Sequence, residues 1–266
     1  MINTKTAIAV AKAFALMLVA SSAHAQLTNL VTNGGFEQTT GPNNGTGQFY
    51  SLNITGWHGS SGSGINSGAN YMSVAANNQV VLSYSWPGVN TLQLWTTQNG
   101  GPNVIPSSPD GGKFVVADGD WGLVPITQTI NGLTPGAKYN LTFDYAAALM
   151  RFPCCSPEYG NNVNVTPSGS WKVSLGNQQF EPTSLSGVVA RGFSGWSQAS
   201  FTYTATASSE VLSFLADGTP LGVPSAVLLD GVSLAPVPEP EEWAMMLVGA
   251  GLVSWQVRRK QAKVTA

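Results

Sequence analysis

Residues 139–146, with the sequence YNLTFDYA, alternate large apolar and polar side chains. The apolar positions are Tyr139, Leu141, Phe143 and Tyr145, and the positions between them are Asn140, Thr142 and Asp144. Successive side chains of a β-strand point to opposite faces, so this pattern predicts a strand with one face in a core and the other outside it. The preceding residues, 131–136 (NGLTPG), have the composition of a turn between two strands.

Similar short runs of β-branched and aromatic residues recur between Gly, Pro, Asn and Ser, and no long helical pattern separates them. The predicted strands are residues 30–31, 79–84, 91–95, 113–117, 126–130, 139–146, 171–175, 200–204, 211–215 and 227–234. We therefore expect an all-β fold, an antiparallel β-sandwich. Residues 41–70 and 97–112 are rich in Gly, Asn, Ser or Pro and read as long loops. Such loops are either ligand-contacting surfaces or merely irregular surface.

The region 26–235 has five Lys and Arg against ten Asp and Glu, a net charge of −5. Phosphate backbones bind mainly to clustered Lys and Arg, so nucleic acid is not an expected partner. Neutral Asn, Gly, Ser, Thr and Gln dominate instead. Such a composition suits hydrogen bonding to neutral polar ligands, including sugars.

The N-terminus has the pattern of a secretory signal peptide. Lys5 and Lys12 precede an apolar run over 13–20, and Ala23-His24-Ala25 is the small-x-small pattern of a cleavage site before Gln26. The alternative is a buried N-terminal helix. We expect residues 1–25 to be the signal peptide and 26–235 to form one exported β domain.

Residues 238–260, PEPEEWAMMLVGAGLVSWQVRRK, combine a Pro/Glu turn, a short apolar run and a basic end. As a helix, 243–257 would be about 22 Å long, against about 30 Å for a membrane's hydrocarbon core. The basic cluster favours a cytoplasmic C-terminus for this short transmembrane helix. A core or amphipathic helix is the alternative, although no polar face separates from an apolar stripe.

This tail resembles the PEP-CTERM sorting signal, in its subgroup with Trp-Ala after the Pro-Glu-Pro motif. The matching positions are Pro238, Glu239, Pro240, Trp243, Ala244 and the basic Arg258, Arg259 and Lys260. The resemblance implies that residues 236–266 are recognised by an exosortase, which cuts near Pro-Glu-Pro. It also implies an exported protein of a Gram-negative envelope, anchored transiently in the inner membrane before display at the cell surface or in the extracellular matrix.

A second resemblance covers nearly the whole region 26–235. The opening LVTNGGFEQ (30–38) and the closing VLLDGVSL (227–234) look like the first and last strands of galactose-binding-like jelly rolls, which include many carbohydrate-binding modules. Such modules often hold a structural calcium between these strands. The resemblance assigns that role to Glu37 and Asp230, and hard oxygen ligands of this kind suit Ca²⁺. Alternatively, both acids cap turns or remain solvated.

Aromatic residues in the loop-rich first half are candidates for contacting sugar rings, because Trp and Tyr offer a flat apolar face with a polar tip. We expect Trp57 and Trp95 to be exposed and to bind ligand, although sandwiches also bury Trp routinely. Trp171 and Trp196 look like core or corner residues.

Catalysis has weaker support. Asp118-Gly119-Asp120 could place two carboxylates at a loop edge, as glycoside hydrolysis requires, but this tripeptide is also a common turn. His58 is the only histidine of 26–235 and has no nucleophile motif near it. Cys154 and Cys155 are adjacent, so a bridge between them would be strained; pairing with other molecules and free thiols are the alternatives.

The sequence thus predicts an exported, noncatalytic β-sandwich that binds envelope or matrix polysaccharide. A structural biofilm or matrix protein without a saccharide site is the alternative, and an envelope glycoside hydrolase is the third.

Overall fold

The computed structural model describes residues 28–41, 47–48, 52–59, 72–76, 81–82, 92–120, 124–151, 164–187, 189–221, 225–238, 248–249, 251–252 and 254–256. Within these ranges the body is all β, and every strand pairing is antiparallel. The expectation of an all-β protein with antiparallel sheets is confirmed.

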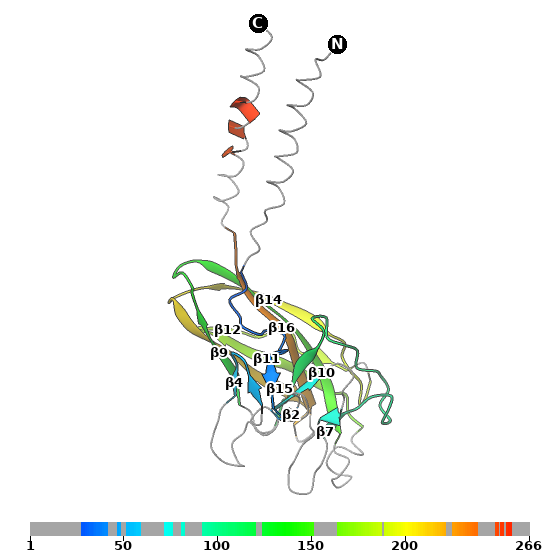
Figure 1. Cartoon of the computed structure of the whole chain (residues 1–266). Coiled ribbons are helices and arrows are strands. Elements are labelled where there is room, and N and C mark those ends of the chain that lie inside the picture. The colour runs from blue at the N-terminus through cyan, green and yellow to red at the C-terminus, as the bar shows by residue number, and fades with distance from the viewer. Residues whose placement is uncertain are drawn as a thin grey trace, which may run out of the picture.

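One sheet has eight strands, with β14 (Ser197–Thr204) pairing to β10 off the main path. Its main path is β2 (Gly47–Gln48), β5 (Met72–Ala76), β8 (Lys113–Asp118), β16 (Ser225–Pro236), β10 (Lys138–Arg151), β7 (Leu92–Leu94) and β6 (Val81–Leu82). The long strands β10 and β16 form its centre (Figure 1).

The second sheet has six strands, with β13 (Leu185–Ser186) pairing to β11 off the main path. Its main path is β12 (Gln178–Phe180), β11 (Ser168–Leu175), β15 (Ser209–Thr219), β9 (Ile126–Asn131) and β4 (His58–Gly59). A separate two-stranded ladder joins β1 (Thr39–Thr40) to β3 (Asn53–Ile54).

The main core lies between the two large sheets. Leu141 and Phe143 of β10 meet Trp171 of β11 and Phe214 of β15 in one buried cluster. The rings of Phe143 and Phe214 pack edge to face at 5.1 Å, and the Trp171 Nε1–H donates to the Leu228 carbonyl at 3.0 Å. Trp171 is therefore a core residue, as expected.

Strand β10 follows the predicted alternation up to Phe143 and then becomes buried on both faces. The reason is a second, smaller core on the outer face of the eight-stranded sheet. There Ala146, Ala148 and Met150 are covered by residues of two loops, including Ile105 and Phe193. Burial on both faces lengthens β10 to Arg151, five residues beyond the predicted end.

The opening and closing motifs lie side by side (Figure 1). Leu30 N–H donates to the Leu234 carbonyl at 2.8 Å, and Val232 N–H donates to the Gly34 carbonyl at 3.1 Å. The predicted strand at 30–31 is nevertheless wrong, because the segment bends instead of forming a ladder. The buried Gln128 amide fixes the bend by bonding both the N–H and the carbonyl of Thr32, at 2.7 and 2.8 Å.

Most other predicted strands correspond to observed ones, from β7 to β11 and from β14 to β16. Of the predicted strand 79–84 only β6 is described. The sequence missed β5 and the short strands β1 to β4, β12 and β13. The loop over 97–112 contains no strand, as predicted, whereas 41–70 includes β2, β3 and β4. The turn at 131–136 is present, with Gly132 and Gly136 at φ 80° and 86°.

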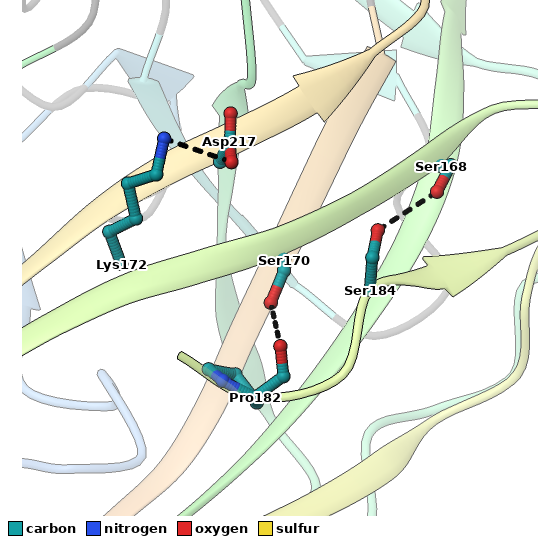
Figure 2. Close-up of polar contacts among 6 residues, drawn as sticks. All are labelled: Ser168, Ser170, Lys172, Pro182, Ser184 and Asp217. Carbon is teal, nitrogen blue, oxygen red and sulfur yellow. Dashed lines mark hydrogen bonds and ion pairs between the residues drawn. The ribbon is translucent and has the colours of Figure 1, made fainter. Parts of the chain in front are cut away.

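A short segment at residues 181–186 closes one edge of the sandwich (Figure 2). The Ser170 hydroxyl donates to the Pro182 carbonyl at 2.8 Å, and the hydroxyls of Ser168 and Ser184 lie 2.9 Å apart. Tyr145 of the opposite sheet donates to the Thr183 carbonyl at 2.7 Å. The segment therefore bonds to both sheets.

Towards the C-terminus, Pro238 follows β16 outside regular structure, and residues 248–249, 251–252 and 254–256 are helical. Among the residues described, no helix has the length and apolar character needed to cross a membrane. The remaining sorting-motif positions, the cleavage positions Ala23, Ala25 and Gln26, and both cysteines lie outside the described residues.

Candidate functional site

Two aspartates face each other across the central strand pair. Asp144 of β10 is the register partner of Asp230 of β16, at a register shift between β10 and β16 where Gly231 adopts φ 56°. Both side chains are buried, with Asp144 at 7 % and Asp230 at 0 % exposure. Like charges directly opposite on neighbouring strands are destabilising, so this pair costs stability unless something compensates it.

Among the described residues, neither carboxylate oxygen of Asp230 has a hydrogen-bond partner in good geometry. Burial raises its pKa from 3.8 to about 8, and the carboxylates of Asp110 and Glu37 add to the rise. The nearby Ser108 hydroxyl and Gly231 amide oppose it. Burial also raises the pKa of Asp144, with the Gln198 side chain opposing and Asp110 reinforcing the change.

Asp110 and Glu37 lie at the exposed rim of these buried acids. A β-carbon placed on Gly35 would collide with an Asp110 oxygen and lie 3.8 Å from an Asp230 oxygen. One placed on Gly231 would lie 2.8 Å from an Asp144 oxygen and 3.4 Å from the Asp110 β-carbon. The absence of side chains at these glycines leaves room for the acids to converge, with Asp110 close to both Asp144 and Asp230.

Glu37 is held in place by the start of β8. Its carboxylate accepts a hydrogen bond from the Lys113 backbone N–H, and the Lys113 ammonium donates to the Glu37 carbonyl at 3.2 Å and to the Thr39 hydroxyl. A side chain on Gly112 would collide with the Glu37 carboxylate. We call Glu37, Asp110, Asp144 and Asp230 the carboxylate site.

The donor chemistry of the carboxylate site fits Ca²⁺, which prefers hard oxygen ligands, and the unpartnered Asp230 oxygens need a cationic partner or a proton. As placed, however, no three Asp, Glu, His or Cys side chains in the described ranges lie close enough together to hold a metal ion. The predicted pair Glu37 and Asp230 does lie at one site, and calcium binding there stays a prediction.

The expectation that Trp57 is an exposed ligand-binding residue is wrong. Its side chain is 4 % exposed, and its ring packs against Phe36 at 5.1 Å and Phe214 at 6.1 Å. Its Nε1–H donates to the Asn33 carbonyl at 2.9 Å. Trp57 therefore stabilises the opening motif from the core side, because its indole ring packs against Phe36 and its N–H bonds to the Asn33 carbonyl.

Trp95 is also buried, at 6 % exposure, which contradicts its expected exposure. Two arginine side chains lie over its ring. The guanidinium carbon of Arg191 is 4.4 Å from the ring centroid, and that of Arg151 is 5.3 Å from it. Two like charges on one indole repel each other, although each gains a cation–π attraction. Within the described part of the chain, the buried Trp95 Nε1–H and Arg151 Nε–H have no acceptor, which typically costs about 1–3 kcal/mol each.

The loop at 97–112 joins Trp95 to the carboxylate site and is fixed at several points. The Asn103 side chain accepts from Phe193 N–H at 3.2 Å, the Trp196 Nε1–H donates to the Pro106 carbonyl at 3.3 Å, and Ile105 enters the second core. The loop is therefore built into the fold. Trp196 packs against the second core, in agreement with its expected place as a core or corner residue.

The outer face of the six-stranded sheet carries a row of neutral polar side chains. Register pairs align His58 with Thr127, Thr127 with Ser213, Ser213 with Ser174, and Ser174 with Gln179. We call these five residues the polar row. With strands about 4.8 Å apart, the row extends about 19 Å across the sheet. The ion pair between Lys172 and Asp217, at 3.0 Å, lies on the same face (Figure 2).

The residues considered for hydrolysis lie at a turn and on a short strand. Asp118 is buried, and its carboxylate accepts from the Asp120 N–H at 2.9 Å, which is the turn alternative. His58 lies on β4, where its carbonyl accepts from the Thr127 hydroxyl at 3.3 Å.

Sequence reasoning missed Asp110, Asp144, Arg151 and Arg191. Asp144 lies within the predicted strand 139–146. Because strands seldom contain Asp, its presence there could have marked it as a candidate site residue. Asp110 lies in the Pro- and Gly-rich loop that the sequence marked as a candidate surface. The sequence offered no comparable signal for the pairing of Arg151 and Arg191 on Trp95, which joins segments far apart in the chain.

Comparison with known proteins gave no matching family model and no matching curated protein. Among solved structures, TmCBM61 in complex with β-1,4-galactotriose matches with a TM-score of 0.37 at 13 % identity, over 79 % of this chain and 99 % of that one. A Stig cyclase from Fischerella sp. TAU matches with a TM-score of 0.40 at 14 % identity, over 80 % and 98 %. An arabinose-bound α-L-arabinofuranosidase matches with a TM-score of 0.36 at 16 % identity, over 81 % and 27 %. Similarities this weak carry no argument about ligand or activity.

Proposed function

We propose that this protein is an exported, noncatalytic β-sandwich of galactose-binding-like, jelly-roll topology that binds polysaccharide. The polar row carries the proposal. It presents hydroxyl, amide and imidazole groups along five neighbouring strands on one face of the sheet. Neutral donors and acceptors in a line suit the repeated hydroxyl groups of a sugar chain.

The PEP-CTERM-like tail and the signal-peptide pattern support export, exosortase processing and a Gram-negative cell-surface or matrix location. In this proposal the tail anchors the chain in the inner membrane until processing, and the body then meets envelope or matrix polysaccharide. Ca²⁺ held by the carboxylate site would join the opening and closing motifs, neutralise the facing aspartates and stabilise the sandwich.

The test is binding of the purified protein to a polysaccharide panel by affinity electrophoresis, with reducing-end assays for turnover. The triple variant Ser174→Ala, Ser213→Ala, Gln179→Ala removes three polar groups of the row. At about 0.5–1.5 kcal/mol for each hydrogen bond, its affinity should fall about tenfold or more.

A matched control lies on the outer face of the other sheet, where register pairs align Ser200, Thr142 and Ser233. Changing these three residues to alanine should leave binding unchanged. A loss of binding in the control alone would place the site on the other face. A folded wild type that binds no polysaccharide would refute the proposal and favour a structural matrix protein, and turnover would favour a hydrolase.

A further inference from the structure

Strand β14 has one paired edge and one open edge. It pairs with β10 over its whole length of eight residues, without a register shift. Among the residues that the structure describes, no second strand pairs with it. The strands that end the two main sheet paths, β2, β6, β4 and β12, are only two or three residues long. β14 therefore has the longest open strand edge in the described part of the body.

The register shows which backbone groups of β14 point to the open edge. The Lys138 carbonyl accepts from the Val237 N–H at 2.8 Å, on the side of β10 that faces β16. Successive strand residues direct their backbone groups to opposite edges, so the even-numbered residues of β10 and their even-numbered partners in β14 point away from the ladder between the two strands. The N–H and carbonyl groups of Gln198, Ser200 and Thr202 therefore face the open edge, and no described residue bonds to them there.

The open edge lacks the features that usually keep sheet edges from pairing. Natural edges are protected by charged residues, prolines, bulges or short length, and residues 192–209 contain no Lys, Arg, Asp, Glu or Pro. By contrast, Glu181 and Pro182 directly follow β12. The Gln178 amide donates to the Thr204 carbonyl at 3.1 Å and so covers only the last residue of β14. A second copy of this acidic body can approach an uncharged edge without placing carboxylates opposite each other.

We propose that two copies of this protein pair antiparallel along β14, about a two-fold axis at Ser200. In this register Ser200 lies opposite Ser200 of the second copy, and Gln198 lies opposite Thr202. Each of these register pairs forms two backbone hydrogen bonds, so the N–H and carbonyl groups at the open edge are all satisfied. On the inner face the half-buried Phe201 meets the small Ala199 of the second copy. The contact goes beyond the proposed polysaccharide binding, because it does not use the polar row.

The two-fold axis places the two tails at opposite ends of the joined sheet. The chain leaves the body at Val237, beside Lys138 and hence beside the Thr204 end of β14. Antiparallel pairing reverses this direction in the second copy. Copies held by their tails on one surface point the same way and do not fit this pairing, whereas released copies and copies on facing surfaces do. The contact is therefore suited to joining surfaces or to building a matrix.

The first experiment is sedimentation equilibrium of the purified protein from about 10 µM to about 1 mM, because one strand pair buries less than the roughly 1,000 Å² of a stable interface and should associate weakly. Reductant prevents Cys154 and Cys155 from linking copies. Wild type should show a reversible monomer–dimer equilibrium. Ser200→Lys places two like charges opposite each other and should weaken dimerisation about tenfold or more. Thr142→Lys adds the same charge one strand farther from the axis and should change little.

A charge swap tests the register itself. Ser200→Glu alone should also weaken dimerisation. An equal mixture of Ser200→Lys and Ser200→Glu should recover it, because opposite charges then face each other across the axis. A variant that is misfolded, or that acts only through net charge, does not recover on mixing.

The second experiment needs no variant. Amide hydrogen exchange, followed by NMR in dilute and in concentrated wild type, reports each backbone N–H separately. The N–H groups of Gln198, Ser200 and Thr202 should exchange fast in the dilute monomer and become protected in the concentrated protein. Those of Ala199 and Phe201, which bond to β10, should be protected in both.

Several outcomes would overturn self-pairing. They are a monomer throughout the concentration range, dimerisation that Ser200→Lys leaves unchanged or that Thr142→Lys weakens equally, and a charge-swapped mixture that fails to recover. Protection of the open-edge amides in the dilute monomer would assign the edge to another segment of the same chain. Protection that appears only with added polysaccharide would assign it to that ligand. Polysaccharide binding itself is tested by the polar-row variants, so failure of one proposal leaves the other standing.

Discussion

Replacing Asp230 by Asn keeps the size of a fully buried side chain and removes its ionisation. The pKa of Asp230 is raised from 3.8 to about 8, chiefly by burial and further by Asp110 and Glu37. Between these values the folded protein keeps a proton that the unfolded chain releases. The contribution of this carboxyl to stability is therefore fully present below about pH 4 and is lost as the pH rises towards about 8.

The size of the loss follows from the same two values. At about 1.4 kcal/mol for each tenfold change in proton affinity, the rise from 3.8 to about 8 corresponds to at most about 6 kcal/mol. The pKa of Asp144, which faces Asp230, is also raised by burial, so the wild-type curve includes the titration of Asp144 as well. The difference between Asp230→Asn and wild type, followed against pH, reports Asp230 together with its coupling to the neighbouring acids.

The assay is urea unfolding in EDTA at pH 4, 6 and 8. Relative to wild type, Asp230→Asn should become progressively more stable, by several kcal/mol between pH 4 and 8. Asp217→Asn is the control, because Asp217 is half-exposed and its ion pair with Lys172 contributes about 1 kcal/mol or less. The difference in unfolding free energy between Asp217→Asn and wild type should stay small at each pH.

A stability difference for Asp230→Asn that does not grow between pH 4 and 8 would refute the reasoning, because the carboxyl would then ionise in the fold without cost. Calcium provides a second readout at pH 8. It should raise the melting temperature of wild type, because it pairs with the ionised carboxylates, and have little effect on Asp230→Asn.

Three further changes test the packing around the carboxylate site by urea unfolding. Trp57→Ala should cost about 3–5 kcal/mol, whereas Ala at the half-exposed Trp255 should cost little; equal effects would contradict the burial of Trp57. Gln128→Leu should cost about 2–4 kcal/mol, because it leaves the Thr32 backbone groups unpaired, and no loss would show that water replaces the amide. Gly112→Ala should destabilise by at least about 1 kcal/mol, because φ is 66° and its methyl would meet the Glu37 carboxylate; an unchanged unfolding midpoint would contradict this approach.

The strands were predictable where one face is buried and one is not. The alternation from Tyr139 to Phe143 works because each side chain meets a single environment. It fails beyond Asp144, where loop residues such as Ile105 cover the outer face. The predicted strand at 30–31 was wrong for another reason. The backbone of the opening segment bonds to β16 and to the Gln128 side chain, and partners so distant in sequence produce no periodic pattern in residues 30–31.

The residues of the candidate site divide in the same way, into those that sequence motifs revealed and those that only folding brings together. Glu37 and Asp230 were found through motifs near the two ends of the domain, whereas Asp110 and Asp144 join them only through folding. Their position in or beside loops suggested that Trp57 and Trp95 are exposed. Whether an indole is buried, however, depends on which side chains from distant parts of the sequence pack against it in the fold. Phe36 and Phe214 cover Trp57, and two arginines cover Trp95.

The length of β10 has a mechanical consequence. Its first residue, Lys138, accepts the Val237 N–H at 2.8 Å where the chain leaves the body, and its fourteenth, Arg151, reaches Trp95. At about 3.4 Å per residue, some 40 Å separate these points along one strand (Figure 1). A body tethered by its tail would carry Arg151 and Trp95 at its far pole, so a stiff strand would set how far this end of the sandwich stands from an anchoring surface.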